Sequence, residues 1–208
     1  MFRRLILAVC LFAGALDAAE KLPSSFLPIP VIRQQTDYSC GAASSAAVLK
    51  YWGLFWGEET DLHSDLETDP KEGTAPSSIV QVLESYGLQV DYQENFTVSK
   101  LRRALKAGKT VILDLQAWRS DTKTAWADLW EDGHYVVAVA IDSKRLYVMD
   151  PSTENYYAYL PLSELMDRWH DYESVDGKVV KNEQAVILAK GKRADKSFRP
   201  PAEVQYMP

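Results

Sequence analysis

Cys40, His134 and Asp150 are the side chains of this sequence whose types and order could perform nucleophilic chemistry. Cys40 precedes Gly41 at the start of a stretch of small residues, His134 follows Gly133 and opens a hydrophobic run, and Asp150 ends the next run. A thiol, an imidazole that accepts its proton and a carboxylate that orients the imidazole form a catalytic triad. The sequence therefore indicates a cysteine nucleophile with a histidine base, as in a cysteine peptidase.

The predicted position of Cys40 favours its thiolate form. A helix is predicted from residue 39 or 40 to residue 52, with Gly53 as its left-handed C-terminal stop. The unsatisfied N–H groups and the dipole at a helix N-terminus stabilise a thiolate, and the backbone N–H of Cys40 can donate to a developing oxyanion. Gln34 and Gln35 both qualify as the second oxyanion donor, because neutral amides donate without titrating.

His134 is the best placed of the three histidines to act as the base. It opens a hydrophobic strand predicted over residues 134–141, so the strand would hold the ring at the mouth of a cleft. His63 lies in an acidic, loop-like segment and is interpreted as a surface residue, and His170 is interpreted as a helix cap or surface group. A purely structural histidine at position 134 is the alternative.

Asp150 ends the strand predicted over residues 146–149. A turn at residues 142–145 would set Asp150 opposite Val136 or Val137. In the Val136 register its side chain shares a face with His134 and lies diagonal to it, within reach in a twisted sheet. Asp150 would then orient the imidazole and stabilise its protonated form. The alternative is that Asp150 only terminates the strand in a turn.

The elements that must position these residues predict an α+β fold, because helices dominate the first half and antiparallel strands the second. With 208 residues, 47% of them hydrophobic, one domain is expected over residues 20–190. Residues 191–208 are predicted to be a disordered tail. The other predicted elements are helices at residues 77–86, 99–107 and 163–169 and strands at residues 88–92, 110–115, 156–160 and 184–189.

The order and spacing of these motifs resemble family thirty-nine of the cysteine peptidases, which process bacteriocin leaders after a double glycine. The family pattern has a glutamine six positions before a Cys-Gly that opens a helix, then a Gly-His strand, then a strand that ends in Asp-Pro. This sequence matches it over about residues 30–190, with Gln34, Cys40-Gly41, Gly133-His134 and Asp150-Pro151.

The resemblance implies a papain-like fold, in which an N-terminal helix that holds the nucleophile packs on an antiparallel sheet. It also implies roles for four residues: Cys40 as nucleophile, His134 as general base and acid, Asp150 as orienting group and Gln34 as an oxyanion donor. The best-known members are domains of peptide-exporting transporters, whereas this sequence contains no transporter and resembles the exported, stand-alone members. The double-glycine specificity is therefore not carried over.

Residues 1–19 have the pattern of a cleaved signal peptide: a basic pair at residues 3–4, an apolar core and a small-residue cleavage site near Ala19. The core is shorter than the roughly 20 residues that span a bilayer, so we expect a periplasmic or secreted protein with no stable membrane anchor. An uncleaved anchor is the alternative. After cleavage, Cys40 is the one remaining cysteine, which excludes an internal disulfide.

The net charge of −6 disfavours nucleic acid and anionic membranes as partners. Much of the acidity lies in residues 58–72, which we interpret as a solvated loop, with a site for cationic substrate segments as the alternative. These carboxylates lack the spacing and glycine of a calcium loop, so no metal is expected, and no cofactor either.

Trp118, Trp130 and Gly133 precede the predicted base and could line a substrate groove; Trp126 and Trp130, four residues apart, could equally be helix core. The expected function is an exported endopeptidase that cleaves a peptide or protein, such as a leader or a component of a secretion system. The alternatives are a thiol amidase or transferase and a non-catalytic binding module that assists secretion. A pure binder needs none of the four triad and oxyanion residues, which argues against the last.

Overall fold

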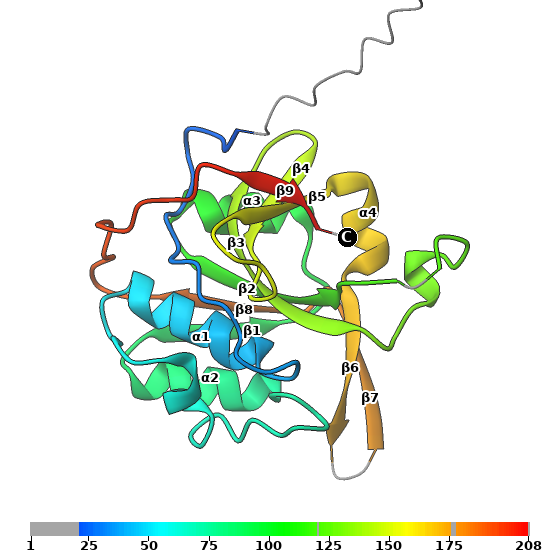
Figure 1. Ribbon diagram of the computed structural model, residues 1–208, viewed down its shortest axis with the longest axis horizontal. Helices are drawn as coiled ribbons and strands as arrows, with labels where there is room; N and C mark the ends of the chain where they lie inside the picture. Colours follow the sequence, from blue (N-terminus) through cyan, green and yellow to red (C-terminus); the bar gives the residue numbers. More distant parts are fainter. Residues whose placement is uncertain (1–20, 120, 176–177, 208) are drawn as a thin grey trace, which may run out of the picture.

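A seven-stranded sheet organises the chain and has helices on both faces, with a two-stranded arm beside it (Figure 1). The computed structural model describes residues 21–119, 121–175 and 178–207. The expected signal peptide lies outside the described residues. In the part of the chain that the structure describes, no helix is long and apolar enough to cross a membrane.

The sheet has the antiparallel character that the sequence predicts. Its strands lie in the order β1-β8-β2-β3-β4-β5-β9, and each neighbouring pair is antiparallel except β5 and β9, which are parallel. The strands are β1 (Gln89–Gln93), β2 (Thr110–Gln116), β3 (Gly133–Ile141), β4 (Arg145–Met149), β5 (Tyr157–Pro161), β8 (Val186–Lys190) and β9 (Val204–Tyr206). Together with the helices described next, this sheet confirms the predicted α+β fold class.

Two helices pack on each face of this sheet. Helices α1 (Cys40–Tyr51) and α2 (Pro76–Ser85) cover one face, and α3 (Val98–Lys106) and α4 (Leu162–Arg168) cover the other. Two short 3-10 helices, η1 (Glu59–Leu62) and η2 (Trp126–Asp128), lie in the connections. All four predicted helices are present, each within one residue of its expected ends, and Gly53 has the expected left-handed backbone, with φ 65°.

The central strand β3 is buried on both faces. Val137 and Val139 point into the core beneath α1 and α2, whereas Val136 and Ala138 point into the core beneath α3 and α4, as the two-residue period of a strand requires. The alanines of α1 are fully buried and let the helix approach β3 closely. The N-terminus of α1 and the start of β3 are therefore fixed relative to each other by the core.

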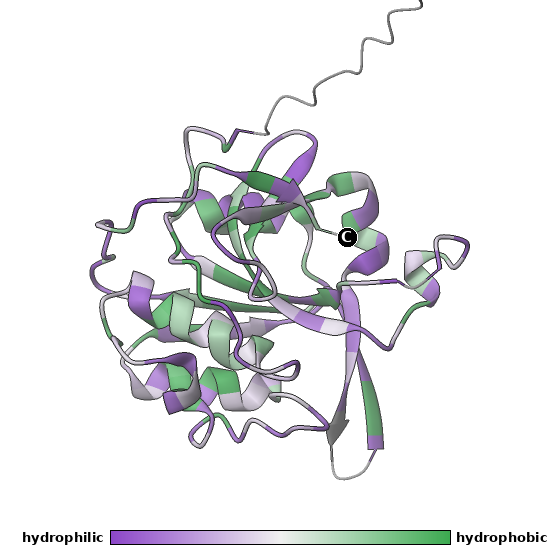
Figure 2. Cartoon of the chain, in the orientation of Figure 1, coloured by the Kyte–Doolittle hydropathy of each residue, from purple (hydrophilic) through white to green (hydrophobic). Residues whose placement is uncertain are grey.

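The structure differs from the prediction in the chain after residue 169. The arm is formed by β6 (His170–Val175) paired with β7 (Lys178–Glu183), and the sequence did not predict either strand. Figure 2 shows a hydrophobic stretch, in green, along β7. Val179 of this strand is 68% exposed. An arm that projects from the body does not need the apolar alternation by which a half-buried strand is detected.

The expected disordered tail is also wrong for the residues described. Residues 204–206 form β9, which pairs with β5, and Met207 is fully buried. The buried guanidinium of Arg168 donates to the backbone oxygen of Met207 at 3.1 Å. The tail is ordered through contacts with distant parts of the chain, which its own composition does not reveal.

Candidate active site

Cys40 is the first residue of α1 and has a free, half-buried thiol. It lines a cleft of about 400 Å3, whose other walls include Gly133, Tyr135 and Trp130. The first N–H groups of a helix have no acceptor within the helix, so they are available to a negative charge at this end. The local sequence explains the position, because the small residues after Cys40 allow α1 to be buried up to its first turn.

His134 and Asp150 form a buried pair next to Cys40, and neither of them is among the residues that line the cleft. The His134 Nε2 atom lies 2.8 Å from Asp150 Oδ1, and both side chains are 1% exposed. The pairing of Val137 with Met149 sets the next residue, Asp150, level with Val136, which is one of the two registers that the sequence left open. Both residues stand at strand ends, where the sheet fixes the backbone and leaves the side chains facing the helix terminus.

The same histidine contacts the thiol. The Cys40 side chain forms a hydrogen bond with His134, and because Asp150 occupies Nε2, the ring nitrogen left for this contact is Nδ1. Burial lowers the pKa of His134, but the Asp150 carboxylate and the Cys40 side chain outweigh burial and raise that pKa to about 10. An imidazole with a raised pKa is protonated at neutral pH and holds that proton beside the thiol.

Asp150 is held in its ionised form. Burial raises the pKa of Asp150, but His134 and the hydrogen bonds from Ser152 bring it below its usual value. Its Oδ1 atom accepts from the Ser152 backbone N–H at 2.8 Å and from the Ser152 hydroxyl at 2.7 Å. The carboxylate is therefore oriented from its own turn and can in turn orient the imidazole.

The two tryptophans expected in a substrate groove have different positions. The ring of Trp118 packs on the imidazole of His134, with centroids 4.8 Å apart, and shields one of its faces. Trp130 lines the cleft of Cys40 and stacks on His170 at 4.3 Å. Trp126 is buried and stacks under the guanidinium of Arg168 at 3.9 Å, so it belongs to the core.

Gly133 lines the cleft, and a side chain there is excluded. A Cβ atom at this position would overlap the Asp171 carboxylate, which lies against the backbone just before His134. Glycine is therefore required by close packing between β3 and β6.

Gln34 lies beside the site in an orientation fixed by its neighbours. Its backbone N–H donates to the Pro151 oxygen at 2.9 Å, and its side-chain Nε2 donates to the Thr36 oxygen at 2.7 Å. A primary amide has two N–H donors, so one remains for a ligand. Among the described residues, no hydrogen bond joins Gln34 to Cys40; the structure gathers Cys40, His134 and Asp150 and puts Gln34 in the segment that leads to the thiol.

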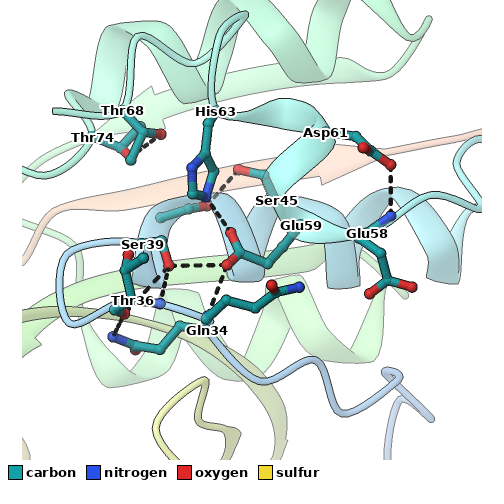
Figure 3. A network of polar contacts seen from close by, with 12 residues as sticks. Gln34, Thr36, Ser39, Ser45, Glu58, Glu59, Asp61, His63, Thr68 and Thr74 are labelled. Atoms are coloured by element: carbon teal, nitrogen blue, oxygen red, sulfur yellow. Dashed lines mark hydrogen bonds and ion pairs between the residues drawn. The ribbon is translucent and has the colours of Figure 1, made fainter. Parts of the chain in front are cut away.

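A second histidine–carboxylate pair, Glu59 and His63, lies on the other side of this segment (Figure 3). His63 Nε2 is 2.6 Å from Glu59 Oε2, and the Glu59 side chain is 1% exposed. Sequence reasoning missed both residues and interpreted His63 as a surface group. The one available signal was their spacing of four residues, which sets two side chains on the same side of a helical turn.

The cleft around Cys40 is acidic. Seven carboxyl side chains and one lysine line it, and they come from four separate parts of the chain. Behind the cleft wall, burial and the charge of Asp171 raise the pKa of Asp114 well above its usual range, so this buried pair holds a proton and contributes less negative charge than its formula suggests. Among the described residues, no group of three His, Cys, Asp or Glu side chains could hold a metal ion.

A helix-borne thiol that faces a histidine on an antiparallel sheet is the architecture of the papain-like cysteine peptidases. A family model described as the Peptidase_C39 like family matches residues 26–176, and the chain belongs to this family. No curated protein sequence matches the sequence of this chain.

Solved structures share the fold at low sequence identity. A C39-like peptidase of Bacillus anthracis matches with a TM-score of 0.59 and 18% identity, over 82% of this chain and 98% of that one. A double glycine motif protease from an AMS/PCAT transporter, solved in complex with the leader peptide, matches with a TM-score of 0.56 and 19% identity. The match covers 81% of this chain and 96% of the protease. The peptidase domain of Streptococcus ComA matches with a TM-score of 0.54 and 18% identity, over 77% and 97%.

Proposed function

We propose that this protein is an exported cysteine endopeptidase that uses Cys40, His134 and Asp150 as its triad and Gln34 as an oxyanion donor. The observation that carries the proposal is His134, whose ring lies between the Asp150 carboxylate at 2.8 Å and the Cys40 thiol. This arrangement supplies a nucleophile, a proton carrier and an orienting group in contact.

The reaction follows from these contacts. The Cys40 thiolate attacks the carbonyl carbon of the peptide bond, and the oxyanion that forms accepts from the Cys40 N–H and the Gln34 amide. Protonated His134 gives its proton to the leaving nitrogen as the C–N bond breaks. The neutral imidazole then takes a proton from a water molecule as the water oxygen attacks the thioester carbon. The C–S bond breaks, the acid product leaves as its carboxylate, and Cys40 returns to its thiolate form. Asp150 stabilises the imidazolium in both half-reactions.

The substrate is proposed to be a peptide or protein segment, such as a leader or a component of a secretion system. The relative solved with its leader peptide supports a peptide substrate, and the signal-peptide pattern of residues 1–19 supports export to the periplasm or beyond. The acidic lining of the cleft favours peptides with basic side chains over acidic ones.

Product analysis tests the proposal. The purified protein, with its thiol reduced, and its Cys40→Ala variant are each incubated with a mixture of defined peptides, and products are identified by mass spectrometry. New peptide C-termini with the wild type and none with Cys40→Ala are expected. New cross-links between the peptides would instead establish a transferase, release of fragments from added cell-wall material an amidase, and peptide binding without cleavage by the wild type a binding module.

A further inference from the structure

The buried carboxylate of Glu59 contacts the segment between Gln34 and Cys40 at two points (Figure 3). Its Oε1 atom accepts from the Gln35 backbone N–H at 2.8 Å and from the Ser39 hydroxyl at 3.0 Å. These contacts join residues that are 24 and 20 positions apart in the chain. Glu59 therefore holds both ends of the segment from outside it.

The contacts continue to the side-chain amide of Gln34. The Ser39 hydroxyl oxygen accepts from the Thr36 N–H at 3.2 Å, and the Thr36 carbonyl accepts from Gln34 Nε2 at 2.7 Å. A continuous chain of hydrogen bonds thus runs from the Glu59 carboxylate to the proposed oxyanion donor. The thiol itself lies outside this chain, since Cys40 contacts His134.

A buried carboxylate is costly unless its oxygens are satisfied. His63 meets this requirement, because its Nε2 atom lies 2.6 Å from the oxygen of Glu59 that the segment does not use. The His63 side chain is 22% exposed, so the pair closes the network on its solvent side. The carboxylate is fully occupied in fixing its neighbours and has no free oxygen for the cleft.

We propose that Glu59, supported by His63, is a positioning residue that sets the Gln34 amide for oxyanion stabilisation. The inference rests on the proposed function. With one amide hydrogen held by Thr36, the second has a fixed direction, and donors act on an oxyanion only when they are fixed before it forms. Loss of the Glu59 acceptor frees Gln35 and Ser39 and with them the orientation of the amide.

Two reactions of Cys40 separate this role from a general effect on the fold. Acylation by p-nitrophenyl acetate passes through a tetrahedral oxyanion as the C–S bond forms and p-nitrophenolate leaves. Alkylation by iodoacetamide displaces iodide without an oxyanion, so it depends on the thiolate alone. Both rates are measured on the full chain without knowledge of the natural substrate, with Cys40→Ala as the background for each.

For Glu59→Ala we expect acylation to slow about tenfold or more while alkylation stays within about twofold. Gln34→Ala should show the same selective loss. Glu59→Gln should restore acylation to within about threefold, because an amide oxygen still accepts from Gln35 and Ser39. Glu84→Ala, which removes an exposed glutamate of α2, is the matched control and should change neither rate.

Equal rates in Glu59→Ala and wild type, or equal slowing of both reactions, would overturn the positioning role. If Glu59→Ala does not fold, Ser39→Ala breaks the same chain by a smaller change, and at least a threefold selective loss of acylation is then required. A wild-type thiol that alkylates like free cysteine and is not acylated would refute the proposed function, and this inference with it.

Discussion

The two histidine–carboxylate pairs of this protein have similar geometry and different surroundings. His134 and Asp150 lie 2.8 Å apart at the ends of β3 and β4, and both are 1% exposed. His63 and Glu59 lie 2.6 Å apart on η1 and the residue after it, with the histidine 22% exposed. The first imidazole contacts a thiol, whereas the second carboxylate contacts a backbone N–H and a hydroxyl.

In each pair, one atom of the imidazole or carboxylate is not used in the contact between the two side chains. The partner of that atom decides what the pair can do. In the first pair the ring nitrogen turned away from the carboxylate meets Cys40, so a proton can move between nucleophile and base. In the second pair the oxygen turned away from the ring accepts from Gln35 and Ser39, so no reacting group is reached. One pair is suited to proton transfer and the other to holding a segment in place.

The largest difference between the pairs should come from removing each imidazole. His134→Ala should lower kcat/KM for a cleaved peptide by about a thousandfold or more, because the base and the proton donor are lost together. His63→Ala should lower it by less than about tenfold, since the carboxylate keeps its other partners. Steady-state kinetics on both variants measures this, and comparable losses in the two would break the distinction.

The carboxylates should differ next, when each is replaced by its isosteric amide. Asp150→Asn should lower kcat about a hundredfold, because an amide does not stabilise the imidazolium. For Glu59→Gln, kcat should stay within about threefold of the wild type, because the amide oxygen can still accept from the Gln35 N–H and the Ser39 hydroxyl. A mild effect of Asp150→Asn, with KM and folding unchanged in both variants, would remove Asp150 from the proposed triad.

The pH dependence of stability tests the pair of His134 and Asp150 without any substrate. The pKa of His134 is raised to about 10, from about 6.5 in the unfolded chain. The stability from this proton is fully present below about pH 6.5 and is lost as the pH rises toward about 10, a change on the order of a few kcal/mol. Asp150 acts in the opposite direction, because its pKa is lowered, and its contribution is lost in acid.

Urea denaturation at a series of pH values measures this effect. The free energy of unfolding should fall with pH in the wild type over that window, and His134→Gln should reduce the slope. A wild-type profile that is flat between about pH 6.5 and 10 would contradict the proposed protonation of His134.

The smallest effect concerns the rings beside each histidine. Trp118 packs on His134 with centroids 4.8 Å apart, whereas Tyr38 lies 6.4 Å from His63. Trp118→Ala should lower kcat about three- to tenfold by admitting water to the imidazole, and Trp118→Phe should restore most of it. Tyr38→Ala should leave kcat within about twofold of the wild type. A larger loss of kcat in Tyr38→Ala than in Trp118→Ala would show that the Trp118 ring on His134 has no role in catalysis.

The sequence predicted the elements whose signals are local. The helix after Cys40, the buried strand after His134 and the register of Asp150 follow from small residues, a continuous apolar run and the length of one turn. These features depend on neighbours close in sequence. That is why the residues brought together at the cleft could be named before the fold was known.

The parts that sequence reasoning missed depend on distant contacts. Glu59 belongs to an acidic stretch interpreted as a solvated loop, and only its approach to Gln35 and Ser39 shows that it is buried. Residues 204–206 become a strand because β5 offers them an edge, and the arm of β6 and β7 is exposed enough to lack an apolar pattern. Such elements are selected by tertiary partners rather than by local propensity.

Alkylation of Cys40 by iodoacetamide as a function of pH tests the central claim most directly. It compares the wild type with His134→Ala and His63→Ala. We predict that at about pH 6 the wild-type thiol reacts at least about tenfold faster than free cysteine, that His134→Ala loses this advantage and that His63→Ala keeps it. Reaction at the rate of free cysteine in all three proteins would contradict a thiolate–imidazolium pair and, with it, the assignment of this site as a peptidase.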